Sequence, residues 1–168
     1  LSLRRQRQMC IRDRYKLSGL KDIENLLDIF LNPGDTVLIE EFSYLGTLAM
    51  LLSRQANVVH IDCDEQGIIP ESLEENLANL KKQNIAPKFM YLISVYQNPT
   101  GITIPLHRRK AIIEIAQKYN VPIFENESYA DFRIDGDPLP TPMYELDDQD
   151  SVTYISAYTK FLGCGLRI

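Results

Sequence analysis

The sequence has little cysteine and no long apolar run. Its three cysteines, Cys10, Cys63 and Cys164, are odd in number and widely spaced, which argues against a disulfide framework and against CxxC-type zinc sites. No segment approaches the roughly 18 apolar residues that cross a bilayer, and no apolar signal-peptide region follows the N-terminus. The two histidines have no partner at metal-ligand spacing. We therefore expect a soluble, cytoplasmic protein without a metal site.

Positive charge is scarce outside the start of the chain. The 168 residues carry a net charge of −5, which does not indicate a nucleic-acid partner or an anionic membrane. Residues 1–14 contain five arginines and one aspartate, so this stretch carries +4 and the remainder carries −9. The stretch has neither helical nor strand periodicity. We interpret residues 1–14 as a disordered or non-native leader, with a nucleic-acid-binding arm as the alternative.

Apolar residues recur at regular spacing through the rest of the chain. Helical spacing predicts helices over 20–31, 46–54, 71–82 and 105–119. Short apolar, β-branched runs predict strands over 36–40, 58–61, 88–95, 121–124 and 151–156. Strands that alternate with helices indicate βαβ units, right-handed crossovers and a mostly parallel sheet buried on both faces. The fold class that we predict is therefore α/β.

Polar side chains follow three of the predicted strands. Asn98, Tyr129 and Lys160 each lie within about five residues of the carboxyl end of a strand. Ligands bind open parallel sheets at this edge, because loops and helix N-termini meet there. We expect these three side chains to line one crevice.

The most specific string in the chain is Val-Tyr-Gln-Asn-Pro-Thr-Gly at 95–101. Asn-Pro-Thr-Gly is by itself a good turn, but Lys160 follows Asn98 by 62 residues and Arg167 follows Lys160 by seven. Four further pieces occur in order: Asn-Pro-Gly-Asp at 32–35, Val-Leu-Ile-Glu at 37–40, Glu-Phe-Ser-Tyr at 41–44 and Gly-Leu-Arg at 165–167. From about residue 18 onward the chain resembles the fold-type-I pyridoxal-phosphate enzymes, in particular the class I and II aminotransferases.

The resemblance implies a three-layer αβα major domain that binds pyridoxal 5'-phosphate. Residues 15–168 would form part of this large domain, and the small C-terminal domain would be absent. Lys160 would be the catalytic residue: it forms a Schiff base with the cofactor aldehyde and then moves the proton between the substrate and the cofactor. An amine is required for a reversible imine, and a cationic, partly desolvated pocket would lower its pKa.

The resemblance also implies residues that hold the cofactor phosphate. Arg167 would clamp the phosphate with its planar fork of donors, with the hydroxyl of Thr159 or Ser156 as a second donor. The family commonly has serine three residues before the lysine, where this chain has Ala157. Ser18 and Gly19 match a phosphate-binding turn at a helix N-terminus, although Ser-Gly before a helix is equally an ordinary N-cap.

Four other residues would contact the cofactor ring. Tyr44 would stack on the pyridine ring, unless it is simply a core tyrosine at a helix start. Asn98 and Tyr129 would hydrogen-bond the 3-oxygen of the ring. Asn126 occupies the position where the family has an aspartate that pairs with the pyridine nitrogen. A neutral amide cannot stabilise a pyridinium as a carboxylate does, so we expect weaker carbanion stabilisation.

Three explanations of Asn126 compete. Strong transaminase activity is lost, a local shift lets Glu125 or Glu127 reach the nitrogen, or the chemistry needs a poorer electron sink. Strand alternation places both glutamates on the face opposite Asn126, which makes rescue by a neighbour awkward.

The resemblance implies an aminotransferase that moves an amino group between an amino acid and a 2-oxo acid in amino-acid metabolism or biosynthesis. The alternatives are the aminotransferase-like sensor domain of a winged-helix transcriptional regulator and a β-eliminating lyase on the same fold. We expect a homodimer at full length, no membrane partner, and no nucleic acid unless a DNA-binding domain lies upstream.

Overall fold

The computed structural model of the chain describes residues 20–157 and residue 160. Within that part, five parallel strands form one sheet in the order β2-β1-β5-β6-β7. The strands are β1 (Thr36–Glu40), β2 (Asn57–Ile61), β5 (Met90–Ile93), β6 (Ile123–Asn126) and β7 (Val152–Ile155). The helices are α2 (Leu20–Phe30), α3 (Leu45–Ser53), α4 (Pro70–Lys82), α5 (Leu106–Lys118) and the short α6 (Met143–Leu146). The predicted mostly parallel α/β fold is confirmed.

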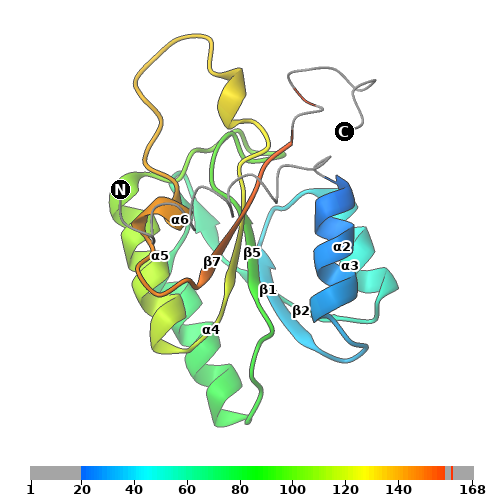
Figure 1. Cartoon of the computed structure of the whole chain (residues 1–168). Helices are drawn as coiled ribbons and strands as arrows, with labels where there is room; N and C mark the ends of the chain where they lie inside the picture. Colours follow the sequence, from blue (N-terminus) through cyan, green and yellow to red (C-terminus); the bar gives the residue numbers. More distant parts are fainter. Residues whose placement is uncertain (1–19, 158–159, 161–168) are drawn as a thin grey trace, which may run out of the picture.

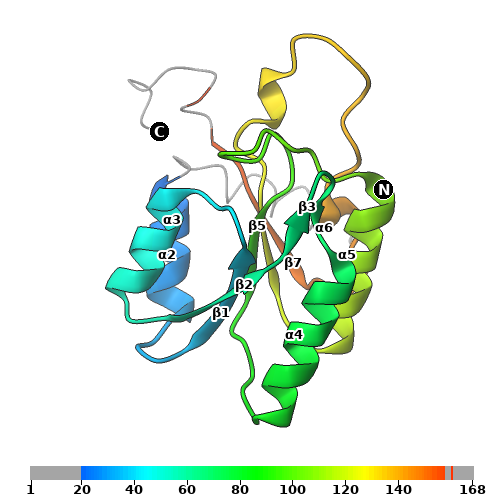
Figure 2. The same cartoon turned by 180° about the vertical axis from the view of Figure 1, so that it is seen from behind.

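Helices cover both faces of the sheet. Figures 1 and 2 show α2 and α3 on one face and α4, α5 and α6 on the other. Each interface has its own apolar core, because the central strands β1, β5 and β6 are buried throughout and send alternate side chains to the two faces. In β1, for example, Val37 and Ile39 pack toward α2 and α3, whereas Leu38 packs toward α4 and α5.

The same alternation decides where polar side chains at the strand ends point. In β6, Ile123 belongs to the core on the α4 and α5 side, and Phe124 belongs to the core on the α2 and α3 side. Period-2 alternation then sends Glu125 toward α5 and Asn126 toward α2 and α3. The opposite orientation that the sequence predicts for these two residues is thus built into the sheet.

The structure differs from the sequence-based expectation at several boundaries. Strand β6 begins and ends two residues later than predicted, so Asn126 lies within the strand. Short elements were not predicted, namely the hairpin of β3 (Cys63–Asp64) and β4 (Gly67–Ile68), the 3-10 helix η1 (Ala130–Phe132) and α6. Elements of two to four residues are too short to show a hydrophobic period, which is the reason that the pattern missed them.

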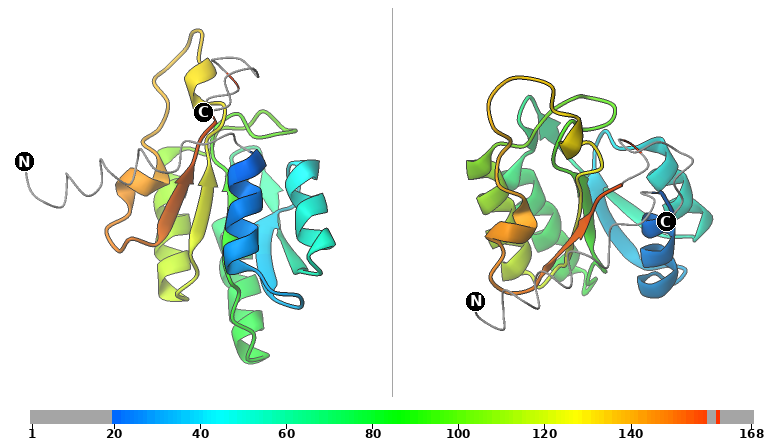
Figure 3. Two further views of the ribbon diagram at one scale, coloured as in Figure 1. Left: turned by 45° about the vertical axis from the view of Figure 1, so that its right-hand side comes forward. Right: turned by 45° about the horizontal axis from the view of Figure 1, so that its top comes forward.

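The carboxyl ends of the strands form one edge of the molecule. The long loop between η1 and α6 rises beyond this edge, as Figure 3 shows. Among residues 20–157 and 160, no helix combines the length and the apolar content that crossing a membrane requires.

Candidate functional site

A pocket at the carboxyl edge of the sheet collects five of the residues singled out in the sequence. Tyr44, Asn98, Asn126, Tyr129 and Lys160 line it, together with Ile23, Ile93 and Ser128. Asn98 follows β5, Tyr129 follows β6 and Lys160 follows β7, so residues far apart in sequence meet where parallel strands end. The structure therefore brings together an amine, two carboxamides and two phenol rings.

Lys160 lies at the open side of this pocket. Its Nζ atom is 5.4 Å from the centroid of the Tyr129 ring, within the range of a cation–π contact. The side chain is nevertheless exposed. The described residues therefore do not enclose this side chain.

Tyr44 is the residue that precedes α3, and its ring lies directly over Gly46. A Cβ atom added at Gly46 would lie 2.7 Å from Cζ and 2.9 Å from Oη of Tyr44, with a closer contact to Cε1. Real Cβ atoms do not approach other atoms so closely, so the ring occupies space that only glycine leaves open. Sequence inspection did not single out Gly46, although a glycine in the first turn of a helix is a usable signal.

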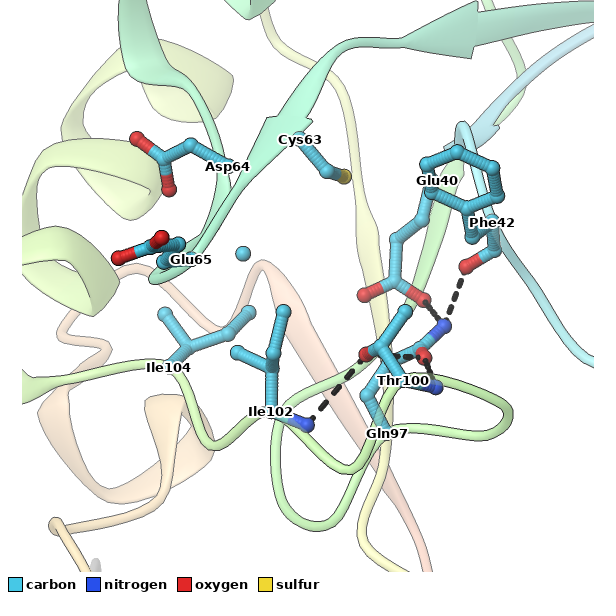
Figure 4. Close-up of a pocket in the computed structure, with 10 residues that line it drawn as sticks. Glu40, Phe42, Cys63, Asp64, Glu65, Gln97, Thr100, Ile102 and Ile104 are labelled. Carbon is cyan, nitrogen blue, oxygen red and sulfur yellow. Dashed lines mark hydrogen bonds between the residues drawn. The ribbon is translucent and has the colours of Figure 1, made fainter.

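The loop that carries Asn98 is held by the side chain of Gln97 (Figure 4). Its Oε1 atom accepts hydrogen bonds from the backbone N–H of Thr100 at 2.9 Å and from Oγ1 of Thr100 at 2.7 Å. Its Nε2 atom donates to Oε2 of Glu40 at 3.4 Å and to the carbonyl oxygen of Phe42. The Asn-Pro-Thr-Gly turn is thereby tied to the end of β1.

Glu40 joins this loop to the sheet. Its Oε2 atom also accepts the backbone N–H of Ile93 at 3.1 Å, across the β1–β5 pair. The side chain is fully buried, and this burial raises the pKa of its carboxyl to about 8. Neither Glu40 nor Gln97 was chosen from the sequence. The sequence signal that could have identified Glu40 is its position as the glutamate that ends an otherwise apolar strand.

Asn126 is fixed by hydrogen bonds at both ends of its carboxamide. Its Oδ1 atom accepts from the backbone N–H of Ser128 at 3.0 Å and from the Ser128 hydroxyl at 2.6 Å. Its Nδ2 atom donates to the hydroxyl of Tyr91 at 2.7 Å. Tyr91 projects from β5 to the same face of the sheet, one strand away. Asn126 is only 6% exposed, so its side chain has little freedom to turn.

Glu125 and Glu127 face away from this pocket and bind a buried arginine. Nη1 of Arg109, on α5, lies 2.8 Å from Oε1 of Glu127 and 3.4 Å from Oε1 of Glu125. Nη2 and Nε of Arg109 donate to backbone carbonyl oxygens of the loop that follows β5. The guanidinium therefore links α5, this loop and the end of β6, with no exposure to solvent.

The two glutamates share one cation and one hydroxyl. Oγ of Ser94 lies 2.8 Å from Oε1 of each carboxyl group. A hydroxyl donates one hydrogen only, so the two carboxyl groups compete for it unless one of them carries a proton. Burial and the charge of Glu127 both raise the pKa of Glu125, in agreement with one proton held by the pair. The idea that a local shift lets either residue reach the pocket is therefore disfavoured.

The remaining candidates fall outside the pocket or outside the described residues. Ser156 and Ala157 are buried after β7. Ser18, Gly19, Thr159 and Arg167 lie outside the described residues.

Residues 16–168 match the family model described as aminotransferase class I and II. Aromatic-amino-acid aminotransferase 1 of Thermococcus litoralis is 34% identical over 140 residues, which cover 83% of this chain and 33% of that protein. The mitochondrial kynurenine/alpha-aminoadipate aminotransferase of Mus musculus is 31% identical over 170 residues, with 97% of this chain and 39% of that protein covered.

Solved structures of aminotransferases are also similar to this chain. Kynurenine aminotransferase of Pyrococcus horikoshii, crystallised with PMP, superposes with a TM-score of 0.84 at 32% identity over 89% of this chain and 37% of that one. A multiple substrate aminotransferase of Thermococcus profundus superposes with a TM-score of 0.84 at 33% identity, with 89% of this chain and 37% of that one covered. The chain thus spans roughly a third to two fifths of the length of these relatives.

Proposed function

The chain belongs to the class I and II aminotransferase family, and from this membership we propose that the whole protein is a pyridoxal-phosphate-dependent aminotransferase. It would transfer an amino group between an amino acid and a 2-oxo acid. The observation that carries the proposal is the single pocket in which Lys160 meets Asn98, Asn126 and Tyr129 at the carboxyl edge of the sheet.

The chemistry of the pocket side chains fits the cofactor. When bound, pyridoxal phosphate supplies an aldehyde that joins to amines and a ring that takes up electrons from the amino-acid α-carbon. Lys160 provides the amine and the base that holds and returns a proton. The amide of Asn98 and the hydroxyl of Tyr129 provide donors for a ring oxygen, and Tyr44 provides an aromatic face.

The phosphate would be held by residues beyond the described part of the chain. We assign this role to Arg167, to Thr159 and to the Ser18–Gly19 turn, as the family resemblance implies. The relatives extend well past the length of this chain, and in our proposal a further small domain completes the substrate site.

The two alternative functions are not favoured. The relatives compared above are named as aminotransferases, and they cover most of this chain. A winged-helix regulator and a β-eliminating lyase would both keep the cofactor pocket, but no observation on the described residues favours either.

The proposed partners are an amino acid, a 2-oxo acid and a second copy of the whole protein. Large apolar side chains on α2 and α3 are exposed, with Ile29 at 73%, Leu45 at 74% and Leu52 at 58% exposure. Such side chains on neighbouring helices are typical of a surface that another chain covers. A cytoplasmic location remains part of the proposal.

The proposed reaction is tested with the whole protein, pyridoxal phosphate, an amino-acid donor and 2-oxoglutarate. Aromatic amino acids, kynurenine and α-aminoadipate are suitable donors, since relatives are named for them. We expect glutamate to form in proportion to the donor consumed. Release of ammonia without glutamate would instead identify a lyase, and cofactor binding without turnover of any donor would favour a sensor domain.

The contact between Gly46 and the Tyr44 ring leads to a prediction about cofactor affinity. Gly46→Ala places a methyl group where the Tyr44 ring lies, so we expect the ring to leave the pocket and the affinity for pyridoxal phosphate to fall by about 2- to 10-fold. Tyr44→Ala should weaken binding by a similar factor. In a Tyr44→Ala background, Gly46→Ala should have no further effect, because both changes remove the same contact. Additive losses in equilibrium titrations would show that Gly46 acts through something other than Tyr44.

A further inference from the structure

Asn126 is held in one orientation by its neighbours, and this orientation has a chemical consequence for the proposed cofactor. Resting on the proposed function, in which Asn126 faces the pyridine nitrogen, we propose that Nδ2 of Asn126 donates a hydrogen bond to that nitrogen and keeps it unprotonated. The protein would thus work with a neutral ring, in contrast to the charged ring that an aspartate at this position maintains.

The backbone N–H of Ser128 decides which end of the amide is oxygen. It lies 3.0 Å from one end of the carboxamide, and a backbone N–H can only donate. The atom that faces it is therefore Oδ1, and the other end is Nδ2.

Oδ1 of Asn126 has no free lone pair to accept a hydrogen bond from a pyridinium. A carboxamide oxygen has two lone pairs, and here the backbone N–H and the hydroxyl of Ser128 occupy both. Nδ2 has two hydrogens, and among the described residues one of them is bound, to the hydroxyl of Tyr91. The group that Asn126 can still offer to the pocket is therefore an N–H donor.

The groups around Asn126 do not supply a negative charge in its place. Glu125 and Glu127 bind Arg109 on the opposite face of the sheet. Burial raises the pKa of Tyr91, so its hydroxyl stays neutral. A pyridinium would thus have no carboxylate among these neighbours, whereas an unprotonated ring nitrogen would accept the Nδ2–H bond.

The protonation state is measured by ¹⁵N NMR on the whole protein loaded with pyridoxal phosphate that carries ¹⁵N in its ring. We expect the wild-type signal in the range of an unprotonated pyridine, and the Asn126→Asp signal in the range of a pyridinium. A pyridinium signal in the wild type would overturn this inference and leave the proposed function intact. Failure of the protein to bind the cofactor would instead remove the proposed function.

Two further readouts separate orientation from general damage. Ser128→Ala frees one lone pair of Oδ1 but keeps the backbone N–H that sets the orientation of the amide, so Nδ2 still faces the ring nitrogen and we expect the wild-type signal; a pyridinium signal there would contradict the assignment of the orientation to the backbone N–H. Asn126→Asp should also raise the rate of the single-turnover reaction with an amino acid by about 10- to 100-fold. An unchanged rate would show that another group already protonates the ring.

Discussion

Lys160→Ala is expected to cause the largest loss of activity among the changes considered for this protein. In the proposed function, the variant lacks both the amine that attaches the cofactor and the base that moves the substrate proton. We expect borohydride to fix no cofactor to the protein, and amino transfer to fall by at least about 10²–10⁴-fold, the range that a positioned general base contributes. Mass spectrometry after reduction and a steady-state assay measure the two effects.

Lys118→Ala is the matched control for this experiment. Lys118 is exposed on α5 and pairs with Glu74, so it lies on the helical layer and does not line the pocket. We expect this variant to retain cofactor attachment and activity at the wild-type level. Retention of the reduced cofactor adduct in Lys160→Ala would disprove the assignment of Lys160.

Arg109→Met is expected to cause the largest loss of stability. The substitution keeps an unbranched, flexible side chain but leaves two buried carboxyl groups without their cation. Removal of one member of a buried ion pair typically costs about 3–5 kcal/mol. We expect a loss of this size in the free energy of unfolding near pH 8, measured by urea denaturation of the whole protein.

The pH dependence of this loss has a definite sign. Arg109 lowers the pKa of Glu125, so its removal raises that pKa further above the unfolded value. When folding raises the pKa of a carboxyl group, the protein becomes less stable as the pH rises through the folded-state pKa and the group ionises. The difference in free energy of unfolding between the wild type and Arg109→Met should therefore shrink toward pH 5. Addition of Glu127→Gln should recover part of the loss. A deficit that is independent of pH and of Glu127→Gln would point to lost packing alone.

Most of the fold could be predicted from the sequence because the chain alternates periodic helices with mostly apolar strands. Strand β1 is an example, since each of its five residues is buried and each is apolar or β-branched except Glu40. The hairpin β3–β4 and helix α6 escaped prediction, because two to four residues do not complete a period. The boundaries of β6 were displaced because Glu125 and Asn126 are polar yet buried.

The candidate site could also be predicted in part, from the positions of polar residues at strand ends and not from hydrophobic periodicity. Asn98, Tyr129 and Lys160 were chosen because they follow strands, and parallel strands place their carboxyl ends together. Gln97 and Arg109 were not chosen, since each acts through contacts with residues distant in sequence. Gly46 was not chosen because its effect depends on where the Tyr44 ring lies. The order and spacing of residues along the chain do not reveal such contacts.

The sequence by itself determined the alternation of strands and helices, the edge of the sheet where polar residues gather and the substitution of asparagine for aspartate at position 126. Only the tertiary structure decided how that asparagine is oriented and why its acidic neighbours cannot replace it. The physical reason is that the hydrogen bond to Tyr91 and the pairing of Glu125 and Glu127 with Arg109 join residues far apart in sequence, which meet only when the sheet and its helices have packed. The bonds from Ser128 are local and complete the orientation of the asparagine.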